Sequence, residues 1–131
     1  MSSSIQNRPS QPGCKHLIKW ESFDYYAPLQ RVRRHIEGNY REKITLGTAA
    51  RIAGMEETYF SSFFHQKTGV CFIEWLHHVR VERAMGLLSR TDQRVTDVAY
   101  EVGFSDLRTF ERAFKRETSL TPREFKKRSN P

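Results

Sequence analysis

The chain has 131 residues, a formal net charge of +7 and a sequence pI of about 9.7, which fits one basic domain or two small lobes that share a core. No apolar run approaches the roughly 20 residues that span a bilayer, and the N-terminus lacks the apolar core of a secretory signal, so the sequence predicts a cytoplasmic protein. Two cysteines, Cys14 and Cys71, are too few for a disulfide framework.

Residues 1–24 are predicted to form a poorly ordered basic arm. Its first part is rich in Ser, Gln, Asn and Pro, and such a composition buries too little apolar area to offset the entropy of ordering. Arg8, Lys15 and Lys19 add positive charge. A contact with nucleic-acid phosphates, a solvated tail and the remnant of a linker are all open interpretations. The distal part carries apolar residues that can pin it onto the body: Leu17, Ile18, Trp20, Phe23 and Tyr25.

A first lobe is predicted over residues 29–69. Pro28 suits the first position of a helix, and an apolar stripe follows it at Leu29, Val32, Ile36 and Tyr40. A second helix begins after Thr45, a plausible N-cap, and ends at Gly54, which suits a left-handed C-cap. A third helix covers about residues 57–67. Its core side is predicted to carry Tyr59, Phe60, Phe63 and Phe64, and its outer side Thr58, Ser61, Ser62 and His65.

A long helix is predicted over residues 72–88, between the two lobes. It has two apolar faces, one with Trp75 and Leu76 and one nearly opposite with Ala84 and Leu88. A helix that is apolar on two sides is buried on two sides. We therefore expect a bridge, roughly 25 Å long, that packs against both lobes and fixes their spacing.

A second lobe is predicted over residues 94–128. One helix carries an apolar stripe and ends at Gly103, and Ser105 or Asp106 can cap the next. That next helix points Leu107, Phe110, Ala113 and Phe114 inward and Arg108, Arg112, Lys115 and Arg116 outward. A short final helix begins with Thr121-Pro122-Arg123-Glu124, a capping box, buries Phe125 and ends in three basic residues.

The two lobes repeat one sequence unit. Residues 46–55 recur as residues 95–104, and after one inserted residue the match continues from residue 60 onto residue 110. A repeat of this period indicates one supersecondary unit used twice, and each copy has the helix, glycine turn and helix of a helix-turn-helix. Two such units in one basic chain predict a protein that contacts two segments of duplex DNA as a monomer.

The second copy carries a family signature. Ala-Tyr-Glu-Val-Gly-Phe-Ser-Asp at residues 99–106, followed by Phe110, Arg112, Phe114-Lys115 and Thr121-Pro122-x-x-Phe125, closely resembles AraC/XylS-type transcription regulators. The first copy and Arg80-Val-Glu-Arg-Ala84 of the bridge match as well. The resemblance covers about residues 29–128. It implies an all-α domain of about seven helices over residues 25–128, two helix-turn-helix lobes joined by the bridge, and an activator that contacts RNA polymerase.

The outer side of the helix after Asp106 holds the main candidates for DNA contact. Arg112 is the first candidate for a base contact, because Arg bonds guanine O6 and N7 bidentately, and the resemblance implies the same position. Arg108 and Thr109 lie one turn earlier and are the next candidates. Lys115 and Arg116, with Lys67 of the first lobe, are expected to reach phosphates, which position a protein without specifying sequence.

The corresponding helix of the first lobe is more neutral. Thr58, Ser61, Ser62 and His65 are its candidates for base contact, and small hydroxyls discriminate weakly between bases. Glu56 and Glu57 open this helix where the family has neutral residues. Three interpretations are open: these acids repel phosphates, accept a hydrogen bond from cytosine N4, or cap the helix and complement its dipole. The capping interpretation is preferred.

Other kinds of function are not favoured. Cys71 aligns with Thr121 and so takes a capping position, and a metal site with His65, His77 and His78 has no recognised ligand spacing. No nucleophile and base constellation or glycine-rich phosphate loop occurs, so we expect no enzyme, no cofactor and no metal. Three hypotheses remain: a sequence-specific regulator of transcription, a co-regulator or anti-activator that acts through a protein partner, and a sequence-neutral nucleic-acid binder. The chain is either stand-alone or an excised C-terminal domain.

Overall fold

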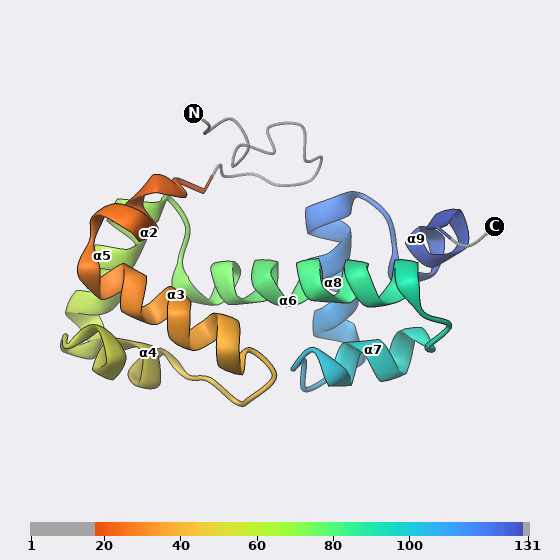
Figure 1. Cartoon of the computed structure of the whole chain (residues 1–131), viewed down its shortest axis with the longest axis horizontal. Helices are drawn as coiled ribbons and strands as arrows, with labels where there is room; N and C mark the ends of the chain where they lie inside the picture. The colour runs from red at the N-terminus through yellow and green to blue at the C-terminus, as the bar shows by residue number, and fades with distance from the viewer. Residues whose placement is uncertain (1–17, 130–131) are drawn as a thin grey trace. The chain divides into compact units, whose positions relative to one another are not determined.

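The computed structural model describes residues 18–129, which form eight α-helices and contain no β-strand (Figure 1). The predicted all-helical class is confirmed, and one short helix, α2, adds to the seven that the sequence indicated. Within these residues the chain divides into two compact units, unit 1 over residues 18–76 and unit 2 over residues 77–129. Each unit contains one helix-turn-helix.

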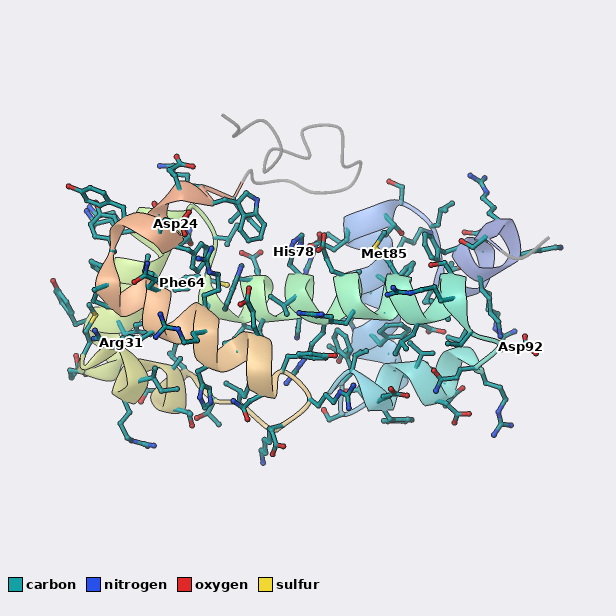
Figure 2. All side chains as sticks on the ribbon, in the orientation of Figure 1. Asp24, Arg31, Phe64, His78, Met85 and Asp92 are labelled. Atoms are coloured by element: carbon teal, nitrogen blue, oxygen red, sulfur yellow. The ribbon has the colours of Figure 1, made fainter. Side chains whose placement is uncertain are left out.

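Unit 1 contains four helices and the start of a fifth: α2 (Glu21–Tyr25), α3 (Ala27–Asn39), α4 (Leu46–Ala53), α5 (Glu57–Thr68) and the first turn of α6 (Phe72–Arg90). Its core is strongly aromatic. Phe64 of α5 lies at the centre (Figure 2), with ring centroids 5.6 Å from Phe72 and 5.7 Å from Trp75. Edge and tilted ring pairs of this kind add stability beyond the buried area, so α5 is held firmly by its inner side.

Helix α2 corrects the predicted arm. Phe23 is fully buried, and its ring lies 4.9 Å from the ring of Trp75 and 5.8 Å from that of Phe64. The backbone N–H of Lys19 also donates to the carbonyl of Thr68 at 2.8 Å. The expectation that apolar residues pin the distal part of the arm onto the body is confirmed for Phe23, which completes the aromatic core, but not for the exposed Tyr25. Residues 19–24 therefore belong to unit 1 and are not part of a poorly ordered arm. The first 17 residues, with Arg8, Cys14 and Lys15, lie outside the described residues.

Unit 2 contains the remainder of α6 with α7 (Val95–Glu101), α8 (Leu107–Thr118) and α9 (Pro122–Ser129). Its core is built from smaller aliphatic side chains of α6 and α7 together with the aromatic side chains of α8. Phe110 and Phe114 of α8 are fully buried. The predicted capping box of α9 is confirmed, since Thr121 and Glu124 exchange hydrogen bonds at 2.9 and 3.1 Å.

Helix α6 supplies side chains to both cores. Trp75 and Leu76 are buried in unit 1, and Ala84 and Leu88 are buried in unit 2. The prediction of a helix that is apolar on two sides is thus confirmed. Its N-terminal half packs in the core of unit 1, and its C-terminal half packs in the core of unit 2. The carboxylate of Glu74 accepts from the backbone N–H of Cys71 at 3.2 Å, as the alignment of Cys71 with Thr121 predicted.

A left-handed glycine ends the first helix of each helix-turn-helix. Gly54 has φ of 75° and Gly103 has φ of 109°, a region that residues with a Cβ enter at a steric cost. Thr45 is the N-cap of α4, where its hydroxyl accepts from the N–H of Thr48 at 3.1 Å. These local signals position α5 and α8 after their turns.

The C-terminal end of α4 is held by Arg31 of α3, which lies beside it (Figure 2). The guanidinium donates to the carbonyls of Ile52 at 3.1 Å and Ala53 at 2.9 Å, two acceptors that the helix leaves unpaired. We expect Arg31→Ala to lower the free energy of unfolding by about 1 kcal/mol, because a cation at a helix C-terminus also complements the dipole.

Urea unfolding at pH 7 checks this expectation, with Arg34→Ala as the matched control. Arg34 is an exposed residue of the same helix, and its side chain makes no hydrogen bond or ion pair within residues 18–129. Its replacement should change stability by less than about 0.5 kcal/mol. Equal effects of the two substitutions would contradict the capping role of Arg31.

Candidate nucleic-acid interface

Helix α8 presents a basic outer side. Phe110, Ala113 and Phe114 turn inward and are buried, as predicted. Arg108, Arg112 and Lys115 are exposed, whereas Arg116 and the predicted core residue Leu107 are half-buried. Within the described part of the chain, the side chains of Arg108, Arg112 and Lys115 make no hydrogen bond or ion pair. They are therefore available to a partner.

The first turn of α8 is fixed by Asp106, one of the two caps that the sequence offered. Its carboxylate accepts from the backbone N–H of Thr109 at 2.7 Å and from the Thr109 hydroxyl at 3.0 Å. These bonds, the backbone one first, lower the pKa of Asp106. Because the hydroxyl of Thr109 is already engaged, this residue is a weaker candidate for base contact than Arg108 or Arg112.

The predicted base-contact residues of α5 include no Lys or Arg. Thr58, Ser62 and His65 are exposed, and Ser61 is half-buried. With the repeat offset of 50 residues, the three exposed side chains occupy the positions of Arg108, Arg112 and Lys115. Tyr59 corrects the prediction, because its side chain is 60% exposed rather than in the core. Sequence reasoning missed it because an aromatic residue beside two core phenylalanines was assigned to their side.

The acids that open α5 have different roles. Both carboxylate oxygens of Glu56 accept from backbone N–H groups, those of Thr58 and Tyr59, at 3.0 Å each. These bonds lower the pKa of Glu56, so the preferred capping interpretation is confirmed for this residue. Glu57 is exposed in the first turn of α5, and its carboxylate accepts no hydrogen bond from a described residue.

Lys67, a predicted phosphate contact, lies against aromatic rings. Its ammonium is 5.1 Å from the centroid of Tyr26 and 6.0 Å from that of Phe63. Both distances are in the range of cation–π attraction. The half-buried side chain thus covers part of unit 1 and is less free to reach a phosphate than the exposed cations of α8.

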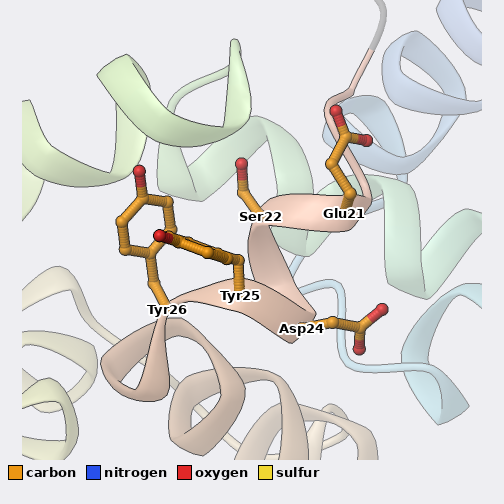
Figure 3. A pocket seen from close by; sticks show the side chains of 5 residues that line it. All are labelled: Glu21, Ser22, Asp24, Tyr25 and Tyr26. Atoms are coloured by element: carbon orange, nitrogen blue, oxygen red, sulfur yellow. The ribbon is translucent and has the colours of Figure 1, made fainter.

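A shallow pocket of about 470 Å³ lies at the junction of α2 and α3. Figure 3 shows Tyr25 and Tyr26 on one side of this junction and Glu21 and Asp24 on the other. Asp24 is paired with Arg33 at 2.7 Å, and Tyr25 is 78% exposed. The pocket offers aromatic area and carboxylates, which suit a protein contact better than a polyanion.

Charge is unevenly shared between the two units. Lys and Arg outnumber Asp and Glu by four in residues 77–129 and by one in residues 18–76. Attraction to phosphates depends on the number of cations brought close to them. Unit 2 is therefore the stronger candidate for a nucleic-acid contact.

The helix caps make stability depend on pH. The pKa values of Glu56, Asp106 and Glu124 are lowered first of all by backbone N–H groups that bond the ionised form. A lowered pKa in the folded state adds stability above the unfolded pKa, and this stability is lost as the pH falls through the folded value. We expect thermal unfolding to occur at lower temperature below about pH 4 than at pH 6.

Asp106→Asn isolates one of these caps. Asn caps a helix about as well as Asp but does not titrate, so the variant should match the parent at pH 6 and lose less stability on acidification. Melting curves at pH 6, 4 and 3 measure the difference. An unchanged pH dependence would exclude Asp106 as a contributor.

Residues 18–129 contain neither a metal-binding cluster nor a membrane-spanning helix. No cluster of three or more His, Cys, Asp or Glu side chains is arranged to hold a metal ion there. None of the helices in this range combines the length and apolar character that crossing a membrane requires.

Comparison with known proteins identifies the family. A family model described as a helix-turn-helix domain matches residues 49–128. An uncharacterized HTH-type transcriptional regulator of Staphylococcus aureus is 33% identical over 119 residues, which are 85% of this chain and 16% of the relative. The chain thus spans about one-sixth of that protein's length.

Two solved structures share the fold. The probable AraC family transcriptional regulator of Rhodopseudomonas palustris has a TM-score of 0.72 at 26% identity, covering 79% of this chain and 98% of that one. The DNA-binding domain of AdpA, a global transcriptional factor solved in complex with a target DNA, has a TM-score of 0.72 at 28% identity, covering 77% and 91%. This chain belongs to the AraC-type family of helix-turn-helix transcription regulators. The family and fold are those of DNA-binding regulators and not of enzymes.

Proposed function

We propose that the protein binds duplex DNA with sequence preference through its two helix-turn-helix units and thereby regulates transcription. The observation that carries the proposal is the row of Arg108, Arg112 and Lys115 on the second helix of a helix-turn-helix. These three cations are exposed and make no hydrogen bond or salt bridge with a described residue. The AdpA domain, similar in fold and 28% identical, was solved with its target DNA.

The two units are assigned unequal parts. In unit 2, Arg112 and Arg108 contact base edges, Thr109 contributes from its capped position, and Lys115 and Arg116 contact phosphates. In unit 1, α5 discriminates loosely through Thr58, Ser61, Ser62 and His65, while Lys67 reaches a phosphate. The free arginines of α8 and the lack of Lys and Arg among the base-contact residues of α5 support this division.

The mode of binding follows from the repeat. We propose that one monomer occupies one site with two unequal boxes in successive major grooves, which lie about 34 Å apart. The internal repeat and the single helix α6, which belongs to both cores, support a monomer. Cytoplasmic location, activation and contact with RNA polymerase rest on the sequence features and the family resemblance.

A second function is supported by a specific observation on unit 1. The exposed Tyr25 and Tyr59, the free Glu57 and the engaged Lys67 make its surface less suited to phosphates than that of unit 2. Such a surface fits a co-regulator that acts through a protein partner.

Selection of genomic DNA fragments separates the two functions. The purified protein is expected to enrich fragments that share a motif with two boxes about one helical turn apart. Gel shifts with random duplexes of the same length provide the control for binding without sequence preference. Equal retention of selected and random duplexes would count against sequence preference and favour the co-regulator. Footprints that require a dimer on a palindrome would instead contradict the proposed binding of one monomer to two boxes.

Salt dependence provides a further prediction. Each phosphate contact by Lys or Arg contributes a slope of about −0.9 to the plot of log affinity against log salt. With Lys115 and Arg116 of unit 2 and Lys67 of unit 1 on phosphates, we expect a slope of about −3 or steeper. Titrations between 50 and 200 mM salt, about the range over which such contacts respond, measure it. A flat plot would count against DNA binding.

A further inference from the structure

Unit 2 has a basic groove apart from the outer side of α8. Arg94, Arg123, Lys126 and Lys127 line it together with Asp92, and its volume is about 440 Å³. The groove lies next to the turn between α6 and α7, where Asp92 is labelled in Figure 2. Four cations against one carboxylate make this concave surface positive, and the contacts of the helix-turn-helix do not account for it.

The cations of the groove differ in how they are held. The ammonium of Lys126 donates to the carbonyl of Gln93 at 2.6 Å, which joins α9 to the segment before α7. Arg94 pairs with Asp97 at 3.3 Å, although its side chain remains 83% exposed. Arg123 and Lys127 are exposed and make no hydrogen bond or ion pair with any described residue. One lysine therefore fixes the groove, while two cations one turn apart remain free for a ligand.

The basic surface of α9 continues toward α8. Glu124 of α9 lies close enough to Lys115 of α8 and Arg128 of α9 for both cations to help lower its pKa, after the larger effects of Thr121. Arg128, like Arg123 and Lys127, is exposed. A band of positive charge thus runs from the end of α8 across α9 to the groove.

We propose that Arg123 and Lys127 bind the phosphate backbone of DNA that flanks the box contacted by α8, so that unit 2 covers more DNA than its recognition helix alone requires. This inference rests on the proposed function. A polyanion fits the groove because its free groups are cations, and DNA is favoured over an acidic protein because the same basic band includes the end of α8. The contact adds affinity without sequence preference.

The test uses duplexes that differ only in flank. The selected site is prepared with short or long flanking DNA next to the box that unit 2 contacts. That box is identified as the one in which Arg112→Ala relaxes the base preference. The parent protein should bind the long-flank duplex more tightly. Arg123→Ala/Lys127→Ala should weaken binding to that duplex by about 10-fold, reduce the salt slope by about 2 and leave binding to the short-flank duplex nearly unchanged.

Arg34→Ala/Lys43→Ala is the matched control, because it removes two exposed cations of unit 1 that have no bonding partner in residues 18–129. This variant should keep the full advantage of the long flank. Circular dichroism verifies that both double variants fold. A parent protein that binds both duplexes equally, or an Arg123→Ala/Lys127→Ala variant that keeps the flank advantage, would overturn the inference.

Two further outcomes are distinguishable. Retention of the protein on immobilised polyglutamate tests for an acidic protein partner. If Arg123→Ala/Lys127→Ala abolishes this retention but leaves DNA binding unchanged, the groove binds an acidic protein and the inference is overturned. A parent protein that binds no duplex, or binds all duplexes equally, would instead refute the proposed function itself.

Discussion

Arg112→Ala is expected to weaken binding to the selected site by about 1–3 kcal/mol and to relax the base preference at one position of the unit 2 box. Arg112 is exposed near the middle of α8 and makes no hydrogen bond or salt bridge with a described side chain, so its guanidinium can form a bidentate bond with guanine. Affinities for duplexes with each base substituted in turn provide the measurement.

Lys115→Ala is the matched comparison on the same helix. Lys115 is equally exposed but lies in the last turn of α8, where we expect the DNA backbone. Its loss should weaken binding to all duplexes about equally and reduce the salt slope by about 1. If Lys115→Ala changes the preferred base while Arg112→Ala does not, the two assigned roles are reversed. If neither changes affinity, the function through a protein partner is favoured.

His78→Ala is expected to lower the free energy of unfolding of unit 2 by about 1–3 kcal/mol, the cost of leaving a buried hydrogen-bonding group without its partner. His78 of α6 and Glu117 of α8 are 5% and 6% exposed, and the imidazole Nδ1 lies 2.8 Å from the Glu117 carboxylate. Removal of the imidazole leaves a carboxyl group buried without this partner, and the desolvation of that group is then uncompensated.

A double-mutant cycle tests this coupling. Urea unfolding is followed by circular dichroism for His78→Ala, Glu117→Ala and the double variant, whose loss should be clearly smaller than the sum of the single losses. Tryptophan fluorescence provides an internal comparison, because Trp20 and Trp75 both lie in unit 1. His65→Ala, an exposed residue of α5, is the control and should have little effect. Additive losses would mean that the pair contributes no coupling energy.

The two predictions are connected through α8. Its inner side carries Phe110, Phe114 and the buried Glu117, and its outer side carries Arg108 and Arg112. The pair of His78 and Glu117 therefore fixes the helix whose opposite side contacts DNA in the proposed function. A destabilised pair should also reduce DNA affinity at temperatures near the unfolding transition, without a change in base preference.

Much of the helix-turn-helix could be predicted from the sequence because it depends on local interactions. Thr45 and Asp106 cap helices through residues three positions later, and Gly54 and Gly103 supply the left-handed backbone of the two turns. The outward position of Arg108 and Arg112 follows from helical periodicity. Each of these features is determined within one or two turns of chain.

The sequence by itself determined the repeat, the helix boundaries set by caps, the basic outer side of α8 and the family. Only the tertiary structure decided which partners meet across the chain. Phe23 packs on Trp75, Lys67 lies on Tyr26, and His78 pairs with Glu117, 39 residues away. Periodicity assigns a residue to a side of its helix, but it does not specify which distant side chain covers that side. That choice follows from the packing of whole helices.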